Sequence, residues 1–85
     1  MKYRVWWWRQ ILNRRKMEFK EVKSVEEAKE VLKQLASKDL KNKDVIANGG
    51  GLEIFEDGAW GEYYDDLGRD IWEIIEEEDE EEVNV

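Results

Sequence analysis

The segment that decides the fold is IANGGGLEIFEDGAWGEYY, residues 46–64. Its second half contains two short runs, LEIFE (52–56) and WGEYY (60–64), whose aromatic and β-branched residues are typical of β-strands. The dipeptide Asp57-Gly58 between them favours a tight two-residue turn, because Asp and Gly adopt the positive φ values that such turns need. Together these features predict an antiparallel β-hairpin.

The length of that turn sets which residues face each other. With a two-residue turn, Phe55 lies opposite Trp60, and Glu53 lies opposite Glu62. Two like charges at facing positions are mildly destabilising unless both are solvated. A three-residue loop that includes Ala59 would shift this pairing.

Three consecutive glycines, Gly49–Gly51, separate the hairpin from DVIAN (44–48), which is predicted to be a short strand. Neither Lys nor Ser follows them, as a P-loop requires, and a strand is predicted where a dinucleotide-binding motif has a helix. The main interpretation is a bend or bulge between two strands, with at least one glycine at positive φ. The alternative is a close approach to the backbone by a ligand or by a neighbouring subunit.

The N-terminal part of the chain predicts a second hairpin. KYRVWWW (2–8) and MEFKEV (17–22) both have the composition of strands, and a long basic loop (9–16) is expected to join them. The helix that follows is signalled by Ser24 and Glu27, which form a capping box. Apolar residues then recur at helical spacing and predict an amphipathic helix over residues 24–37. The side chains expected to point at the sheet are Val25, Ala28, Val31, Leu32 and Leu35.

Charge is distributed unevenly along the chain. Residues 1–16 contain basic side chains and no acidic ones, whereas residues 76–82 are seven consecutive acids. Adjacent carboxylates repel one another, so residues 76–85 are predicted to be a solvated and disordered tail. The sequence therefore predicts one α+β domain over residues 1–75. This domain comprises an antiparallel sheet of four or five strands with one amphipathic helix packed on one face, and the acidic C-terminal tail follows it.

Composition excludes several classes of function. The chain has no His and no Cys, so Ser-His-Asp and Cys-His catalytic sites and zinc–thiolate sites are impossible. We therefore expect no enzyme activity, no metal and no cofactor. The net charge of −8 argues against direct binding of nucleic acid. No apolar run is long enough to span a membrane and no signal peptide is recognised, so the cytoplasm of the host cell is the expected location.

The carboxylates of EYYDDLGRD superficially resemble those of a calcium-binding loop. Asp65, Asp66 and Asp70 surround Gly68, but the spacing of an EF-hand loop and its distal bidentate Glu are missing. A turn closed by Asp66 and Gly68 is the expected structure.

The tryptophans are the most informative feature for function. Alternation along a strand sends Trp7 to one face and Trp6 and Trp8 to the other, which also carries Lys2 and Arg4. Aromatic rings beside cations suit a nucleobase, another flat ligand or a protein contact. The alternative is that the helix covers this face and that these tryptophans form the core.

Several stretches resemble the phage superinfection-exclusion protein family, a group of small soluble proteins encoded by phages and prophages. The similarity covers residues 2–72 and rests on MKYRVWWW, FKEVKSVEEAK, NGGGLEIFEDGAWGEYYD and GRDI. Family members carry prolines after the paired tryptophans, where this chain has none. The resemblance implies a role in excluding a second phage or in countering a host defence, without a defined catalytic mechanism.

Two functions are compatible with these features. In the first, the protein binds and sequesters a small anionic, nucleotide-like signal, and the free N–H groups of the glycines help to hold it. In the second, its carboxylates imitate nucleic acid and inhibit a host defence protein or nuclease. A homodimer is also expected, because association covers apolar surface and protects strand edges. The residues predicted to bind the ligand or partner are Arg4, Trp6, Trp8, Arg9, Asn48, Gly49, Gly50 and Gly51.

Overall fold

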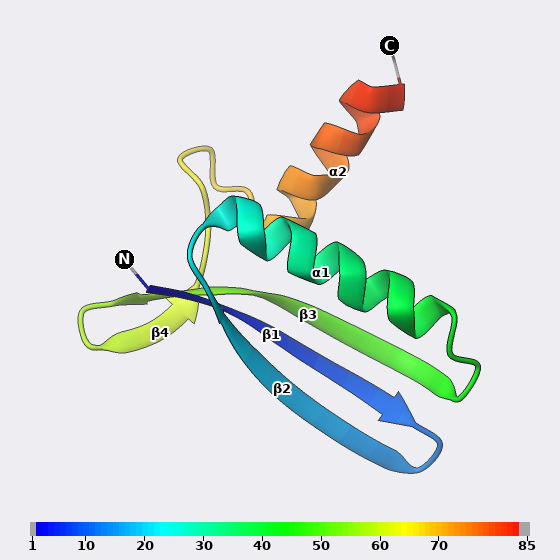
Figure 1. Ribbon diagram of the computed structural model, residues 1–85. Coiled ribbons are helices and arrows are strands. Elements are labelled where there is room, and N and C mark those ends of the chain that lie inside the picture. Colours follow the sequence, from blue (N-terminus) through cyan, green and yellow to red (C-terminus); the bar gives the residue numbers. More distant parts are fainter. Residues whose placement is uncertain (1, 84–85) are drawn as a thin grey trace.

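The protein has an α+β fold built on a four-stranded antiparallel sheet (Figure 1). The computed structural model describes residues 2–83, and the side chains of residues 2–79. The strand order is β2-β1-β3-β4, and α1 lies across one face of the sheet while α2 packs against α1 and β3. The predicted fold class is thereby confirmed, with four strands. The elements are β1 (Lys2–Ile11), β2 (Arg14–Val22), α1 (Val25–Leu40), β3 (Val45–Glu56), β4 (Ala59–Glu62) and α2 (Ile71–Val83).

The first hairpin is longer and tighter than predicted. β1 continues to Ile11, and only Leu12 and Asn13 form the turn, with Leu12 at a φ of 56°. The expected basic loop over residues 9–16 is therefore wrong. The basic residues can pair as strands because they are exposed or, as with Arg9, bound to carboxylates of other elements.

The second hairpin matches its prediction. Phe55 pairs with Trp60 and Glu53 with Glu62, so Ala59 lies in the strand and not in the turn. Both turn residues have a positive φ, 53° for Asp57 and 79° for Gly58. The like charges of the Glu pair are relieved because Arg4 of β1 donates to Glu53 at 2.7 Å.

β3 runs without a bend through the glycines, so the predicted short strand 44–48 and the predicted bend at Gly49–Gly51 are both wrong. Among the described glycines, Gly58 and Gly68 have a positive φ, and none of the three residues Gly49–Gly51 does. The irregularity of the sheet lies elsewhere. The register between β1 and β3 shifts between Gln10 and Ile11, close to the last residue of β1 and the first residue of β3.

Helix α1 starts as the capping box predicts. The Ser24 hydroxyl accepts from the Glu27 amide at 3.1 Å, and the Glu27 carboxylate accepts from the Lys23 amide at 3.3 Å. Its apolar side faces the sheet: Ala28, Val31 and Leu32 are buried, and Val25 and Leu35 pack partly buried against them. The buried core comprises Val5, Trp7, Val22, Ala28, Val31, Leu32, Leu52, Ile71 and Ile75.

The C-terminal segment forms α2, which continues to Val83. Asp70 caps it, because its carboxylate accepts from the Glu73 amide at 2.9 Å. The predicted boundary between residues 75 and 76 therefore falls inside a helix, and residues 84–85 lie outside the described residues; disorder of residues 76–85 stays a prediction. Within the described part of the chain, neither helix is long and apolar enough to cross a membrane.

Candidate functional site

The two faces of the sheet differ in what covers them. Helix α1 covers the face that carries Trp7 and Val5, which are 2% and 1% exposed. We call this the inner face, and the opposite one, which α1 does not cover, the outer face. Trp6 and Trp8 lie on the outer face and are half-buried, so they are not part of the core under the helix.

Each outer tryptophan lies over a glycine of the neighbouring strand. Trp6 pairs with Gly51 and Trp8 with Gly49. A Cβ atom added to Gly51 would lie 2.8 Å from Nε1 of Trp6, and one added to Gly49 would lie 2.7 Å from Nε1 of Trp8. Any side chain at these positions would displace the indole, so the glycines serve the close approach of rings from the same chain.

The middle glycine makes room on the inner face. A Cβ on Gly50 would overlap the ring of Trp7 and would lie 2.5 Å from the carbonyl oxygen of Trp6. The carbonyl oxygen of Gly50 accepts a 2.7 Å hydrogen bond from Nε1 of Trp72 in α2. This glycine therefore joins the sheet, the core and α2, and it is no exposed anion site.

Cations lie against the rings of the outer face. The guanidinium of Arg4 is 4.3 Å from the ring centroids of both Phe19 and Trp60, and that of Arg15 is 5.4 Å from the ring of Trp8. Such contacts are favourable because the ring face carries negative charge. Arg4 is also bound to Glu53, so its charge is already neutralised within the chain. Arg15 has no carboxylate partner among the described side chains.

Arg9 and Asn48 lie on the inner face, at the end of α1. The buried carboxylate of Asp39 accepts from Nδ2 of Asn48 at 3.0 Å, from Nε1 of Trp7 at 2.9 Å and from Nε of Arg9 at 3.1 Å. Burial alone would raise the pKa of Asp39, but the bonds from Asn48 and Trp7 and the charge of Arg9 together lower it below its usual value. This cluster fastens α1 to β1 and β3.

The residues predicted as one site therefore divide between two faces. The outer face receives Arg4, Trp6, Trp8, Gly49 and Gly51, whereas Arg9, Asn48 and Gly50 belong to the inner face. Lys2, which alternation placed on this face, lies over the ring of Phe55. The further outer-face residues that were not predicted are Phe55, Arg15, Phe19 and Trp60. Placing the first turn at Leu12-Asn13 would have found Phe19, because that turn pairs it with Trp6.

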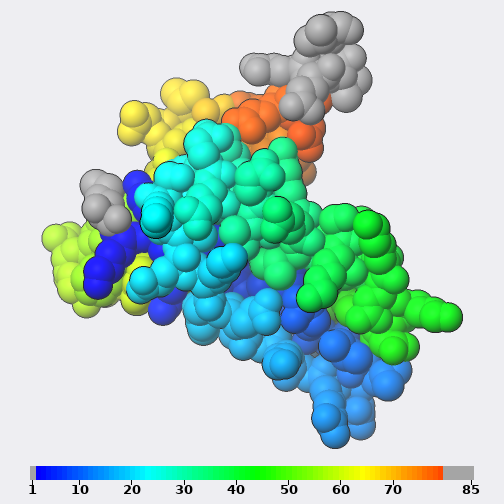
Figure 2. Space-filling model, viewed as in Figure 1, coloured from blue at the N-terminus to red at the C-terminus, as the bar shows by residue number. Residues whose placement is uncertain are grey.

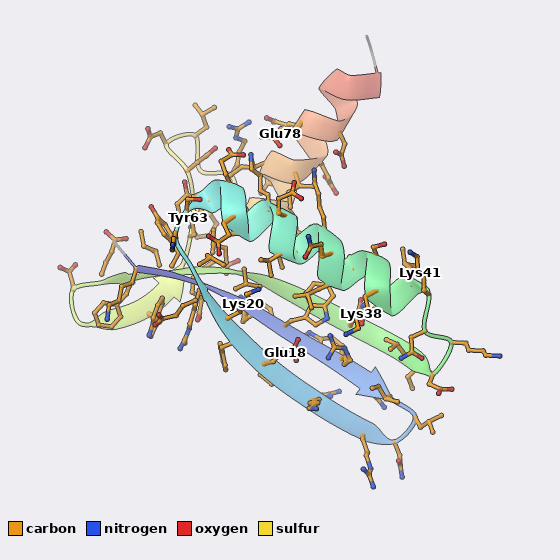
Figure 3. All side chains as sticks on the ribbon, viewed as in Figure 1. Glu18, Lys20, Lys38, Lys41, Tyr63 and Glu78 are labelled. Atoms are coloured by element: carbon orange, nitrogen blue, oxygen red, sulfur yellow. The ribbon has the colours of Figure 1, made fainter. Side chains whose placement is uncertain are left out.

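A groove of about 460 Å³ lies on the inner side, between β2 and α1. Figure 3 shows Glu18 and Lys20 on β2 and Lys38 on α1, the three charged residues that line it. Trp7 and Leu35 are among its apolar lining residues. The groove exists because α1 lies mainly over β1 and β3, and Val22 is the one residue of β2 that is buried.

Titratable groups suited to catalysis or metal binding are sparse among the side chains of residues 2–79. Burial, with the nearby Tyr3, Asp65 and Asp66, raises the pKa of Tyr63, so its phenol stays protonated at neutral pH. In the described part of the chain no three acidic side chains come together as a metal site. The turn after β4 is closed by Asp65, not by Asp66 as predicted: its carboxylate accepts from the amides of Leu67 and Arg69.

Comparisons of this chain with models of protein families, with curated proteins and with solved structures find no match.

Proposed function

We propose that this protein is a non-enzymatic binding protein that takes up a small, flat, anionic ligand of nucleotide type on its outer face and sequesters it. The observation that supports this proposal is the uncovered layer of aromatic rings with cations placed against them. Phe19 is 54% exposed and Trp6, Trp8 and Trp60 are half-buried, so their rings remain within reach of a ligand. Exposed aromatic surface of this kind commonly marks a binding site.

The two arginines of the outer face have different roles. Arg4 is held between two rings and paired with Glu53, so it braces the platform. Arg15 lies against the ring of Trp8 and is paired with none of the described carboxylates, so its guanidinium is available to a phosphate. A base stacked on Trp8 would bring its phosphate towards Arg15, and Arg binds phosphate in a bidentate manner.

The resemblance to superinfection-exclusion proteins gives this binding a biological role. A phage-encoded protein that removes a nucleotide-like signal would keep the host's defence effector inactive, and it would act in the host cytoplasm. This role needs no catalysis, only an affinity high enough to lower the concentration of free signal.

The nucleic-acid-mimic function is supported less well. Among the described side chains of the acidic run, Glu77 is paired with Arg69, Glu78 with Lys29, and Asp79 with Lys33. These carboxylates are therefore partly neutralised within the chain, whereas a phosphate mimic has to present them to a basic partner.

Two neighbouring arginines provide the test. Arg15 lies on the outer face, whereas Arg14 pairs with Ile11 at the end of the same strand and projects to the inner side. Calorimetry with cyclic mono- and dinucleotides should show binding by the parent protein. Arg15→Ala should weaken it about tenfold, as the loss of one charge-assisted contact does. Arg14→Ala, with the same change in net charge, should bind like the parent.

Two outcomes would refute this function. One is that none of the nucleotides changes the heat of mixing or the melting temperature. The other is that both arginine variants weaken binding equally, which would indicate general charge attraction and no site on the outer face.

A further inference from the structure

β2 is an open edge of the sheet. It pairs with β1 on one side, and within residues 2–83 no strand pairs with its other side. Residues 14–21 are all exposed. In Figure 1 β2 borders the sheet, and in Figure 2 it projects beyond the helix that covers the other strands. A second chain could therefore approach this edge without meeting α1.

The strand register, together with one hydrogen bond to β3, indicates which backbone groups point out from this edge. The carbonyl oxygen of Gly50 accepts from Nε1 of Trp72 in α2, so the backbone polar groups of Gly50 point away from β1. Its partner Trp7 therefore points to β2, and Glu18, the partner of Trp7, points back to β1. Because direction alternates along a strand, the amides and carbonyls of Met17 and Phe19 point outwards.

We propose that β2 is a dimerisation edge, and that two copies of this chain pair their β2 strands antiparallel with Phe19 opposite Phe19. In this register Glu18 of each copy faces Lys20 of the other, so two opposite-charge pairs form on the inner side. Phe19 and Met17, each 54% exposed, would be partly covered. The two four-stranded sheets would join edge to edge.

Neighbouring registers are less favourable. A register centred on Glu18 places Glu18 opposite Glu18, and Lys16 opposite Lys20. A register centred on Lys20 places two lysines opposite each other at its centre. Like charges at facing positions are destabilising, and edge lysines normally prevent strands from pairing. In the register centred on Phe19, by contrast, Glu18 and Lys20 of the two copies attract each other, so the edge is suited to pairing with a second copy of this chain.

Charge reversal tests this pairing. Glu18→Lys alone and Lys20→Glu alone each convert both cross-pairs into like-charge pairs, so each should raise the dimer dissociation constant about tenfold or more, measured by sedimentation equilibrium. Mixing the two variants should restore association as a heterodimer, because all facing charges are then opposite. Lys41→Glu, which changes the net charge as Lys20→Glu does but lies after α1, should dimerise like the parent.

Three results would overturn the proposal: a parent chain that stays monomeric at high micromolar concentration, single reversals that dimerise like the parent, or a mixture that associates no better than its components. Because Glu18 also pairs with Arg9, circular dichroism is needed to verify that each variant is folded.

A second measurement needs no charge change. The chain has no Cys, so Phe19→Cys should form a disulfide-linked dimer on mild oxidation, and Gln34→Cys on α1 should not. Equal cross-linking of both variants would also contradict the proposed edge.

Discussion

The indole nitrogen of Trp7 donates a 2.9 Å hydrogen bond to Oδ2 of Asp39, which lies 32 residues further along the chain. Both residues are almost fully buried, and the same carboxylate also binds Arg9 and Asn48. One acidic side chain thus connects the central strand, its neighbour and the last turn of α1.

Removing this carboxylate should destabilise the protein strongly. Asp39→Ala leaves the Arg9 guanidinium and the Trp7 indole without their acceptor, and loss of one partner of a buried charge pair costs about 3–5 kcal/mol. Urea unfolding should show this loss. Asp44→Ala, at an exposed aspartate just beyond the helix, should change the free energy of unfolding by less than about 0.5 kcal/mol.

The same carboxylate predicts an acid-sensitive stability. The pKa of Asp39 is lowered in the folded state, so its contribution is present above the unfolded value of about 3.9 and is lost as the pH falls through the lower folded value. Unfolding free energies measured from pH 7 downwards should therefore fall below about pH 4. Asp39→Asn should show a shallower fall, and an identical slope in both proteins would contradict this assignment.

Leu32 and Leu40 provide a matched pair for the packing of α1. Leu32 is fully buried against the sheet, whereas Leu40 in the last turn is 88% exposed. Leu32→Ala should cost about 2–5 kcal/mol, enough to unfold much of so small a domain. Leu40→Ala should stay within about 0.5 kcal/mol of the parent in thermal or urea unfolding.

The close approach of Trp7 predicts that Gly50 is needed for stability. Gly50→Ala forces the indole or the strand to move, and overpacking of this kind costs about 1–3 kcal/mol. Gly61→Ala in β4 meets no atom within 4 Å and should be neutral or slightly stabilising. Equal melting temperatures for the two variants would show that the Trp7 ring relaxes freely. A loss of stability in Gly50→Ala would show that this glycine serves packing, whereas the sequence predicts a role in binding.

The acidic run should contribute little to stability. Deleting residues 76–85 removes three ion pairs, those of Arg69 with Glu77, Lys29 with Glu78 and Lys33 with Asp79. Glu26 still binds Lys29 and Asp65 still binds Arg69, each at 2.7 Å. We expect the free energy of unfolding to change by less than about 1 kcal/mol, because partly exposed ion pairs contribute no more. Amide exchange tests the tail itself: protected amides throughout residues 76–82 would contradict the predicted disorder.

Short sequence motifs correctly predicted the helix start and the turn, which depend on neighbouring residues alone. Ser24 and Glu27 marked the start of α1, and Asp57-Gly58 marked the second turn, because each acts through the backbone next to it. The straight path of β3 through its glycines could not be read locally. It depends on indoles contributed by residues about 45 positions earlier in the chain, as in the pair Trp6 and Gly51.

The candidate site shows the same limit. Alternation correctly placed Trp6 and Trp8 with Arg4 on one face. The same alternation, continued past Trp8, would have sent Arg9 to the other face, but the predicted strand ended too early. Asp39, the partner of Arg9, could not be identified because nothing in the helix pattern distinguishes a buried acid from an exposed one.

The central position of β1 has a consequence for synthesis on the ribosome. Trp6 and its partner Gly51 are 45 residues apart, so at about 5–20 residues per second the tryptophans are made roughly 2–9 s before the strand that receives them. During that interval the nascent chain carries three adjacent indoles on a strand with one unpaired side. Rapid closure of the local β1–β2 hairpin shortens the exposure of one edge, and a chaperone that binds aromatic segments would find its target in residues 5–8.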